Sequence, residues 1–311
     1  MPRHIERNVA HQASERMTTE RFCVGRHCFA LMSMDETGKT LLPNFTDFRI
    51  AEDDGREDRF CVRLEDRLPE WQEDAHCIGE FDSGAGIHGV SLRADGGYQL
   101  TVSDPKGNLC SKIVCTNDFT DVHVMLTQED KDLRSFALNN GMMLAYSFAL
   151  CESDTLLVHA SVIRHDGRGY LMTAPSGTGK STHTYLWYKN IEGCDLMNDD
   201  NPVIRITDGI PTVYGSPWSG KTPCYRNISA PIGAIVNIRQ DPHNVIRRLR
   251  PVEAFTMMLP ACNNMKWDKR IYTSVCSTIE KLIPTTGMWE LRCRPDREAA
   301  IVCHEAVRAN H

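Results

Sequence analysis

The sequence has no apolar run long enough to cross a bilayer. Its longest apolar patch, "MMLAYSFAL" at residues 142–150, is less than half as long as the ~20 residues that a transmembrane helix needs. The first residues, "MPRHIERNVAHQ", carry charges where a secretory signal needs an apolar stretch. We therefore expect a cytoplasmic protein that has no membrane partner.

An excess of basic residues is also missing. The chain has 35 lysines and arginines against 41 aspartates and glutamates, which gives a formal net charge of −6. Nucleic acids and anionic membranes attract basic surfaces. The charge balance therefore predicts that no nucleic acid is a partner.

No two of the 13 cysteines are spaced as C-x-x-C. The nearest pairs are Cys23 with Cys28 and Cys110 with Cys115, and they match neither a zinc ribbon nor a zinc finger. Most cysteines stand among apolar residues. This placement predicts buried free thiols in a reducing compartment.

The pattern of apolar residues changes along the chain. Residues 1–18 are polar and aperiodic and predict a flexible tail. Within residues 19–128 apolar side chains recur with period two, as in "RFCVRLE" (59–65), "YQLTVS" (98–103) and "VHVML" (122–126), and turn sequences such as "ADGG" separate these runs. This region predicts a β-rich N-terminal domain built largely of antiparallel hairpins.

A helix and then an alternation of strands and helices come next. "TQED" at 127–130 is a capping-box pattern, and apolar residues at helical spacing continue to Phe148, although Gly141 weakens this helix by about 1 kcal/mol relative to alanine. The later segments are "LLVHAS", "GYLMTA", a helix from Lys180, "CDLMN", "VIRI", "IGAIVNI", helices near 251–259 and 268–283, "MWELRC" and a last helix opened by Pro295. They predict an α/β domain over residues 129–311.

One glycine motif resembles a dinucleotide-binding site but has the wrong surroundings. "GAGIHG" at 84–89 fits G-x-G-x-x-G, and Asp104 comes at about the twenty-residue distance that this motif requires. The motif must open a helix, so that the helix N-terminus meets the pyrophosphate. The next residues, "VSLRADGGYQL", instead predict a strand, a turn and a strand, so the glycines belong to a hairpin connection.

The stretch "APSGTGKST" at 174–182 predicts a phosphate-binding loop. It matches G-x-x-x-x-G-K-[ST] except that Ala174 takes the first position, where the preceding strand ends and a methyl group is tolerated if φ is negative. Gly177 and Gly179 give the backbone freedom, Lys180 gives a cation for the phosphates, and Ser181 gives a Mg²⁺ ligand. The residues predicted to bind ATP are Pro175, Ser176, Gly177, Thr178, Gly179, Lys180, Ser181 and Thr182.

Two carboxylates come after the loop at a short distance. Asp199 and Asp200 in "LMNDDNP" lie 19 and 20 residues after Lys180. This distance leaves room for one helix and one strand, so we expect both carboxylates at the same sheet edge as the loop. One of them can act as general base while the other holds Mg²⁺. A capped turn is the alternative interpretation of this stretch.

These elements resemble the HPr kinase/phosphorylase and phosphoenolpyruvate carboxykinase group of P-loop kinases. That group has an H-[GCA]-[SV] strand, then S-G-x-G-K-[ST], then a D-D pair, which stand here as "HAS", "SGTGKST" and "NDD". The resemblance covers residues 155–206 well and 215–238 more loosely, where the sequence resembles HPr-kinase-related proteins, including peptide kinases. It implies that Asp199 is the base, that Asp200 and Ser181 hold Mg²⁺, and that His159 lies on a strand beside the phosphates.

A cation that steadies the reacting phosphoryl group is expected in "WSGKTPCYRN" (218–227). Lys221 and Arg226 are the candidates, and Arg226 is preferred because a guanidinium binds phosphate through two hydrogen bonds; solvated surface charge is the alternative for both. The basic stretch 239–250 lies beside a nucleotide or substrate, or else forms a solvated face.

We therefore predict an α/β fold, namely a P-loop kinase of the HPr kinase/PEP carboxykinase type with a β-rich N-terminal part. Its cofactors would be ATP and Mg²⁺, and its acceptor a hydroxyl, either of a serine in a peptide or protein or of a small molecule. Two alternatives stay open: carboxykinase-like transfer to a small metabolite, and an ATP-binding sensor without catalysis. A homo-oligomer is also left open, because HPr kinases form hexamers. The Arg-Gly-x-Gly and Pro-x-Arg-Pro-Gly-Arg-Asn stretches of HPr kinases have no counterpart here, so the resemblance does not identify the acceptor.

Overall fold

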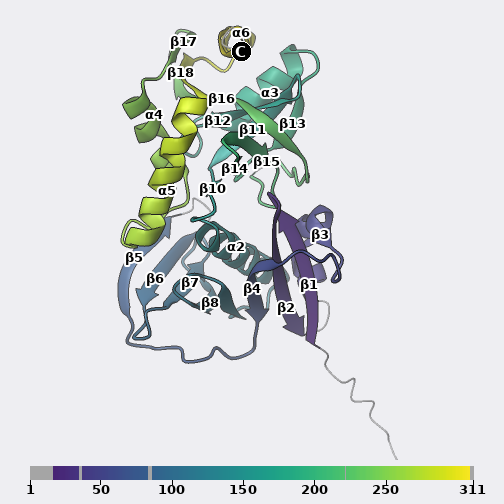
Figure 1. Cartoon of the computed structure of the whole chain (residues 1–311), viewed down its shortest axis with the longest axis vertical. Helices are drawn as coiled ribbons and strands as arrows, with labels where there is room; N and C mark the ends of the chain where they lie inside the picture. Colours follow the sequence, from purple (N-terminus) through teal and green to yellow (C-terminus); the bar gives the residue numbers. More distant parts are fainter. Residues whose placement is uncertain (1–16, 35–36, 83–85, 221, 309–311) are drawn as a thin grey trace, which may run out of the picture.

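The computed structural model describes residues 17–34, 37–82, 86–220 and 222–308, which form a mixed α/β protein with two large sheets (Figure 1). The N-terminal sheet consists of β1 (Met17–Val24), β2 (His27–Met34), β3 (Arg49–Ile50), β4 (Asp58–Leu64), β5 (His76–Asp82), β6 (Ile87–Leu92), β7 (Tyr98–Ser103), β8 (Leu109–Cys115) and β9 (Asp121–Leu126). The second sheet consists of β10 (Thr155–Leu157), β11 (Ala160–His165), β12 (Arg168–Thr173), β13 (Asp195–Asn198), β14 (Val203–Thr207), β15 (Ile210–Tyr214), β16 (Ser229–Gln240), β17 (Val245–Arg248) and β18 (Gly287–Cys293).

Six α-helices lie within the described ranges. They are α1 (Thr37–Leu41), α2 (Lys131–Ala149), α3 (Lys180–Asn190), α4 (Pro251–Met258), α5 (Lys269–Leu282) and α6 (Arg297–Arg308), with short 3-10 helices at Pro43–Phe48, Leu259–Ala261 and Ile283–Thr285. In the part of the chain that the structure describes, no helix combines the length and apolar character needed to cross a membrane. α6 begins at Arg297, so Pro295 precedes this helix rather than opening it.

The N-terminal sheet has the strand order β3-β1-β2-β4-β9-β8-β7-β6-β5. Most neighbouring strands are antiparallel, as the period-two pattern predicts, but β4 runs parallel to both β2 and β9. The predicted tail lies mostly outside the described residues, and β1 includes its last two residues, Met17 and Thr18.

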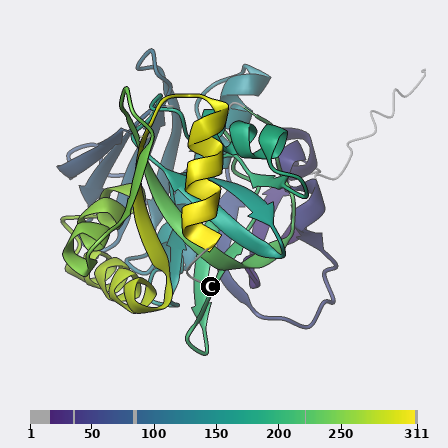
Figure 2. The same ribbon diagram turned by 90° about the horizontal axis from the view of Figure 1, so that it is seen from above.

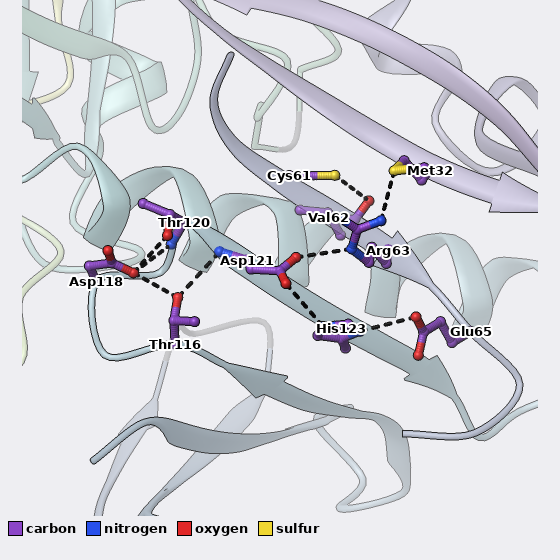
Figure 3. A network of polar contacts seen from close by, with 10 residues as sticks. All are labelled: Met32, Cys61, Val62, Arg63, Glu65, Thr116, Asp118, Thr120, Asp121 and His123. Atoms are coloured by element: carbon purple, nitrogen blue, oxygen red, sulfur yellow. Dashed lines mark hydrogen bonds and ion pairs between the residues drawn. The ribbon is translucent and has the colours of Figure 1, made fainter. Parts of the chain in front are cut away.

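Strands β4 and β9 show how the period-two pattern divides the side chains between two faces. Val62 in the middle of β4 is fully buried. The polar residues that alternate with the buried ones lie on the other face and bind one another (Figure 3). Arg63 Nε donates to Asp121 Oδ1 at 3.0 Å, and the His123 ring lies between Asp121 and Glu65. The polar face of this part of the sheet is therefore held by the Arg63–Asp121 ion pair and by the polar contacts of His123.

The glycine motif at 84–89 leads into a strand, as predicted. β6 begins at Ile87 and pairs with β7 as an antiparallel hairpin. A dinucleotide-binding motif would require a helix at this position. Residues 83–85 lie outside the described residues.

The predicted helix after residue 127 is present as α2, but its cap differs from the prediction. Asp130 caps α2 by accepting hydrogen bonds from the amides of Asp132 and Leu133, each at 3.0 Å. The Thr127 hydroxyl instead donates to the carbonyl oxygen of Leu109 at 2.7 Å. The capping-box prediction at Thr127 is therefore wrong, because the sheet uses this hydroxyl.

Gly141 lies where α2 approaches the N-terminal sheet closely. A Cβ atom at this position would lie 3.3 Å from Ile113 Cδ1 and 3.7 Å from Val124 Cγ2. A larger side chain would push the helix away from the sheet. The glycine therefore serves helix–sheet packing at a small cost in helix propensity.

A hydrophobic core runs from the N-terminal sheet through α2 into the second sheet. Tyr146 of α2 is fully buried, and its hydroxyl donates to the carbonyl oxygen of Val24 at 3.0 Å. His27 Nε2 lies 2.9 Å from the hydroxyl oxygen of Thr155 on β10. Most cysteines are buried, as predicted. Packed side chains thus connect the two sheets, and the division of the chain at residue 128 stays a prediction.

The second sheet has the order β10-β14-β15-β16-β12-β11-β13, with β18 beside β16 and β17 beside β18. α3 and α6 cover one face around a second apolar cluster that includes Trp187 and Ala300. Figure 2 shows α6, in yellow, lying across this face. α4 and α5 contribute to the core on the other side of the sheet. The long strand β16 pairs in parallel with both β12 and β18, so it lies at the centre of this sheet.

Two buried histidines predict that acid destabilises the fold. Burial lowers the pKa of His27 to about 3, with Arg205 and Arg59 adding to the effect, and burial lowers the pKa of His183 to about 4. Both histidines would titrate near pH 6.5 in the unfolded chain. Below that pH the unfolded state binds more protons than the folded state. The free energy of unfolding should therefore fall by about 1.4 kcal/mol per pH unit for each histidine as the pH decreases from 6.5 towards the folded pKa.

Chemical denaturation at a series of pH values measures this slope. We expect His27→Gln combined with His183→Gln to flatten it, and the same change at the exposed His243 to leave it unchanged. An equally steep slope in the double variant would show that other groups cause the acid sensitivity.

Candidate functional site

The predicted phosphate-binding loop connects the end of β12 to the start of α3. Within it, the residues with positive φ are Gly177 (77°) and Gly179 (124°). Ala174 is not among the described residues with positive φ, and it lies at the buried end of the strand. The first position of the motif therefore does not need a positive φ, so alanine can replace glycine there.

The N-terminus of α3 is open towards the loop. Gly179 is the N-cap residue, and no side chain within the described ranges caps this helix end. The hydrogen bonds that hold the loop include one from the amide of Thr178 to the carbonyl oxygen of Pro175 at 3.2 Å and one from Gln240 Nε2 to the carbonyl oxygen of Thr178 at 3.2 Å. Free amides at a helix N-terminus attract anions. The loop thus has the geometry of an anion-binding site.

The sheet topology brings the two carboxylates to the loop. β11 is antiparallel to both β12 and β13, so β12 and β13 end at the same edge of the sheet. Asp199 and Asp200 come directly after β13, and the loop comes directly after β12. Both carboxylates therefore lie at the sheet edge that their spacing from Lys180 predicts. Asn198 stabilises this strand end by accepting a hydrogen bond from the amide of Asp200 at 3.1 Å.

Lys180, His159 and Asp200 form a chain of polar contacts. Lys180 Nζ donates to the carbonyl oxygen of Ala174 at 3.2 Å and to His159 Nε2, while His159 Nδ1 lies 3.4 Å from Asp200 Oδ1. The neutral imidazole with its proton on Nδ1 satisfies both of its contacts. The imidazole of His159 therefore connects the ammonium of Lys180 to the carboxylate of Asp200.

Burial sets the titration of these three groups. Burial lowers the pKa of Lys180, and the nearby carboxylates of Asp200 and Asp199 offset part of this effect. Burial also lowers the pKa of His159; Asp200 acts against this shift, and Lys180 adds to it. Burial raises the pKa of Asp200, which His159 and Lys180 counteract. Burial thus disfavours the charged form of each group, and a bound ion of opposite sign would favour it.

His159 does not lie on a strand, contrary to the prediction. It occupies the gap between β10 and β11, and its amide donates to the carbonyl oxygen of Ala261 at 2.7 Å. The preceding residue, Val158, forms an isolated bridge with Cys262. A partner about a hundred residues away in sequence thus interrupts the strand at this point.

Asp199 is held by donors that the sequence did not single out as site residues. Ser161 Oγ donates to Asp199 Oδ1 at 3.1 Å, and the amide of Thr222 donates to Oδ2 at 3.0 Å. Ser161 also contacts the hydroxyl of Thr184 on α3 at 3.0 Å. Asp199 is 3% exposed, so these contacts fix its orientation. The serine of "HAS" was the one available signal, because it stands two residues after His159.

The two predicted cations differ in their placement. Arg226 Nη1 binds Asp195 Oδ2 at 2.6 Å and so lies at the start of β13, at the opposite end of that strand from Asp199. The structure does not bring Arg226 beside the loop. Lys221 lies outside the described residues, but its neighbours are close to the carboxylates, because a Cβ on Gly220 would lie 3.5 Å from Asp199 Oδ2.

Among the residues that the structure describes, two cavities border the loop. The first, of about 950 Å³, is lined by loop residues 175–178, by His159 and Asn201, and by residues 237–240 at the end of β16. The second, of about 710 Å³, lies against residues 177–179 and has mostly apolar walls. The loop therefore separates two spaces that are each large enough for a small ligand.

The donor set fits Mg²⁺ bound together with a nucleotide. Within the described ranges, no three His, Cys, Asp or Glu side chains gather as a metal site. Mg²⁺ in nucleotide sites takes only one or two protein ligands, and phosphate oxygens and waters complete the octahedron. The hydroxyl of the exposed Ser181 and the carboxylate of Asp200 are oxygen donors of this kind.

No family model matches this sequence, and no curated protein matches it. Among solved structures, the Hpr(Ser) kinase/phosphatase from Coxiella burnetii is similar to part of the chain. The alignment covers 49% of this chain and 93% of that chain, with 12% sequence identity and a TM-score of 0.29. A match at this TM-score does not assign the chain to a family.

Proposed function

We propose that this protein is an ATP-dependent P-loop kinase that transfers the γ-phosphoryl group to a hydroxyl, either of a serine in a peptide or protein or of a small molecule. One observation carries the proposal: an uncapped helix N-terminus, Lys180 and the adjacent carboxylates Asp199 and Asp200 meet at one sheet edge. Phosphoryl transfer needs such amides and cations for the phosphates, and carboxylates for the metal and the proton.

The loop would bind the polyphosphate. The amides of residues 176, 177 and 179–182 would donate to phosphate oxygens, and the Lys180 ammonium would turn from His159 towards the β- and γ-phosphates. Ser181 and Asp200 would hold Mg²⁺, which neutralises charge on the phosphates when it is bound. His159 would remain within hydrogen-bond reach of both Asp200 and the γ-phosphate.

Asp199 would accept the proton of the attacking hydroxyl. Its two oxygens are oriented by Ser161 and by the amide of Thr222, and a fixed carboxylate next to the phosphates is what a general base requires. Lys221 is the favoured cation for the transition state, because both residues that flank it lie near Asp199. Arg226 would have to leave Asp195 to reach the phosphates.

The carboxykinase-like alternative predicts that ATP is converted to ADP only with oxaloacetate, and that ADP is consumed when phosphoenolpyruvate and CO2 are supplied. A kinase of the proposed type would form ADP equally well without them. Measuring ADP release with and without these metabolites distinguishes the two functions.

A glycine substitution in the loop tests nucleotide binding. Gly177 and Gly209 have nearly the same φ, 77° and 76°, and a Cβ on either one meets no atom within 4 Å. Alanine at either position should therefore cost a similar ~1 kcal/mol of folding free energy through the strained φ. Only Gly177→Ala should also weaken Mg²⁺-dependent ATP binding, about tenfold or more, because a lost hydrogen bond to a charged phosphate is worth about 1.5–3 kcal/mol.

Calorimetric titration with ATP and Mg²⁺ measures this difference, and thermal denaturation checks that the two variants are equally stable. Equal ATP affinity in Gly177→Ala and Gly209→Ala would contradict the proposal, as would wild-type protein that does not bind ATP.

A further inference from the structure

Three arginines surround one buried carboxylate beside the first cavity. Glu290 on β18 is 6% exposed at its side chain. Its carboxylate contacts Arg239 Nε at 3.0 Å, Arg247 Nε at 3.1 Å and Arg292 Nε at 3.6 Å. One well-placed guanidinium is enough to pair a carboxylate. The arrangement therefore holds more positive charge than Glu290 needs.

The strand register sets two of these arginines directly opposite each other. Arg239 on β16 is the cross-strand partner of Arg292 on β18, and Arg247 on β17 is the partner of Glu290. Like charges at directly opposed positions destabilise a sheet. A feature that costs stability and that the neighbouring strands do not require points to function.

A fourth arginine extends the charge along the surface. Arg250, which precedes α4, binds Glu253 at 3.1 Å, and Glu253 also contacts Arg247. The arginine cluster (Arg239, Arg247, Arg250 and Arg292) thus has four guanidinium groups against two carboxylates. Its side chains are 49% to 83% exposed. This surface is basic in a chain whose net charge is −6.

The arginine cluster adjoins the proposed reaction site. Arg239 lines the first cavity together with loop residues 175–178 and His159. Asn237, two residues before Arg239 on the same face of β16, lines it too. A molecule that occupies the first cavity and leaves it along β16 would pass over the cluster.

We propose that the arginine cluster is the docking surface for an acidic peptide segment of the acceptor. This inference deepens the proposed function, because it names the class of acceptor. Guanidinium groups bind carboxylates through two parallel hydrogen bonds. The cluster is exposed and spreads over β16, β17, β18 and the start of α4, so it fits an extended chain with several carboxylates better than an enclosed metabolite. The acceptor serine would then lie in the first cavity, near the loop.

Binding of a labelled peptide tests this proposal without nucleotide. The probe is a serine-containing peptide rich in glutamate, and its counterpart has every glutamate replaced by glutamine. Fluorescence anisotropy should show binding of the glutamate peptide only, and this binding should weaken as salt increases. In Arg239→Gln/Arg292→Gln the affinity should fall about tenfold, as expected when two exposed ion pairs are lost, while ATP affinity stays unchanged.

Arg308→Gln is the matched control. Arg308 is 53% exposed, close to the 54% of Arg292, and pairs with Asp166, which precedes β12 and so lies at the opposite sheet edge from Arg239 at the end of β16. Its replacement should leave peptide binding unchanged. The double variant keeps Arg247 on Glu290, so it should fold, and thermal denaturation checks this. If the double variant unfolds, Arg292→Gln alone should still fold, because this arginine makes the longest of the three contacts with Glu290. The single variant should weaken peptide binding about threefold, since one exposed ion pair is lost.

Several results would overturn the docking proposal. They are equal binding of the two peptides, equal losses in the control and the double variant, parallel loss of ATP affinity, and tighter binding of oligothymidylate or oxaloacetate than of the acidic peptide. Failure of the proposed function looks different: the glutamate peptide would bind to the cluster, and no ATP would bind to the loop.

Discussion

Replacing Asp199 by asparagine should lower the rate of ADP formation by about 10²- to 10⁴-fold, the range expected when a general base is lost. Asparagine has the same shape and still accepts the hydrogen bond from Ser161, but it loses the one from the amide of Thr222. The change should therefore cost about 1–3 kcal/mol of folding free energy, while the affinity for ATP should stay unchanged. The loss should appear in kcat, because Asp199 would act on the hydroxyl proton during the reaction rather than on the nucleotide. Steady-state kinetics together with calorimetric ATP binding separate these two quantities.

Asp208→Asn is the control for the change from carboxylate to amide. Asp208 lies in the turn between β14 and β15 with φ at 51°, a conformation that asparagine also tolerates. Its replacement should leave kcat unchanged. If Asp199→Asn, rather than Asp200→Asn, raises the Mg²⁺ concentration that the reaction needs, the two carboxylates exchange roles. If neither change affects the output of the protein while ATP still binds, the protein is a nucleotide sensor without catalysis.

Replacing Lys180 by methionine should lower kcat by about 10²- to 10³-fold, as expected for one lost electrostatic contact to the transferring group. Methionine keeps the buried apolar stem, so the packing of the Lys180 side chain is largely retained. ATP affinity should also fall, in contrast to Asp199→Asn, because Lys180 would bind the phosphates in the ground state as well. Isothermal titration and initial-rate measurements on the same preparation show both effects.

Lys189→Met provides the comparison for this variant. Lys189 lies in the last turn of the same helix and is exposed. Its replacement should change neither kcat nor ATP affinity. Normal turnover in Lys180→Met would contradict the proposed role of the loop.

The spacing of apolar residues predicted those parts of the site that are set by residues close together in the sequence. The strand before the loop, the helix from Lys180 and the strand before Asp199 succeed one another within about thirty residues, and each is present as predicted. Because only one helix and one strand fit between Lys180 and Asp199, their spacing also predicted the sheet edge at which the carboxylates lie. The catalytic roles of these residues stay predictions.

Contacts between distant segments account for the differences. The bridge from Val158 to Cys262 removes His159 from its expected strand, and nothing near residue 159 indicates that partner. Arg226 binds Asp195 because the loop after β15 folds back along β13, a path that composition does not determine. In the same way, the parallel pairing of β4 could not be derived from period-two patterns, which carry no information on strand order.

The position of β4 between two parallel neighbours limits the order in which a newly synthesised chain can assemble. On β4, Cys61 pairs with Ala30 of β2 on one side and with Asp121 of β9 on the other. The first neighbour has already left the ribosome when β4 emerges, whereas the second is translated sixty residues later. Until then one side of β4 has free amides and carbonyls, which can pair with strands of other nascent chains. This interval is one period of synthesis in which the protein is exposed to aggregation.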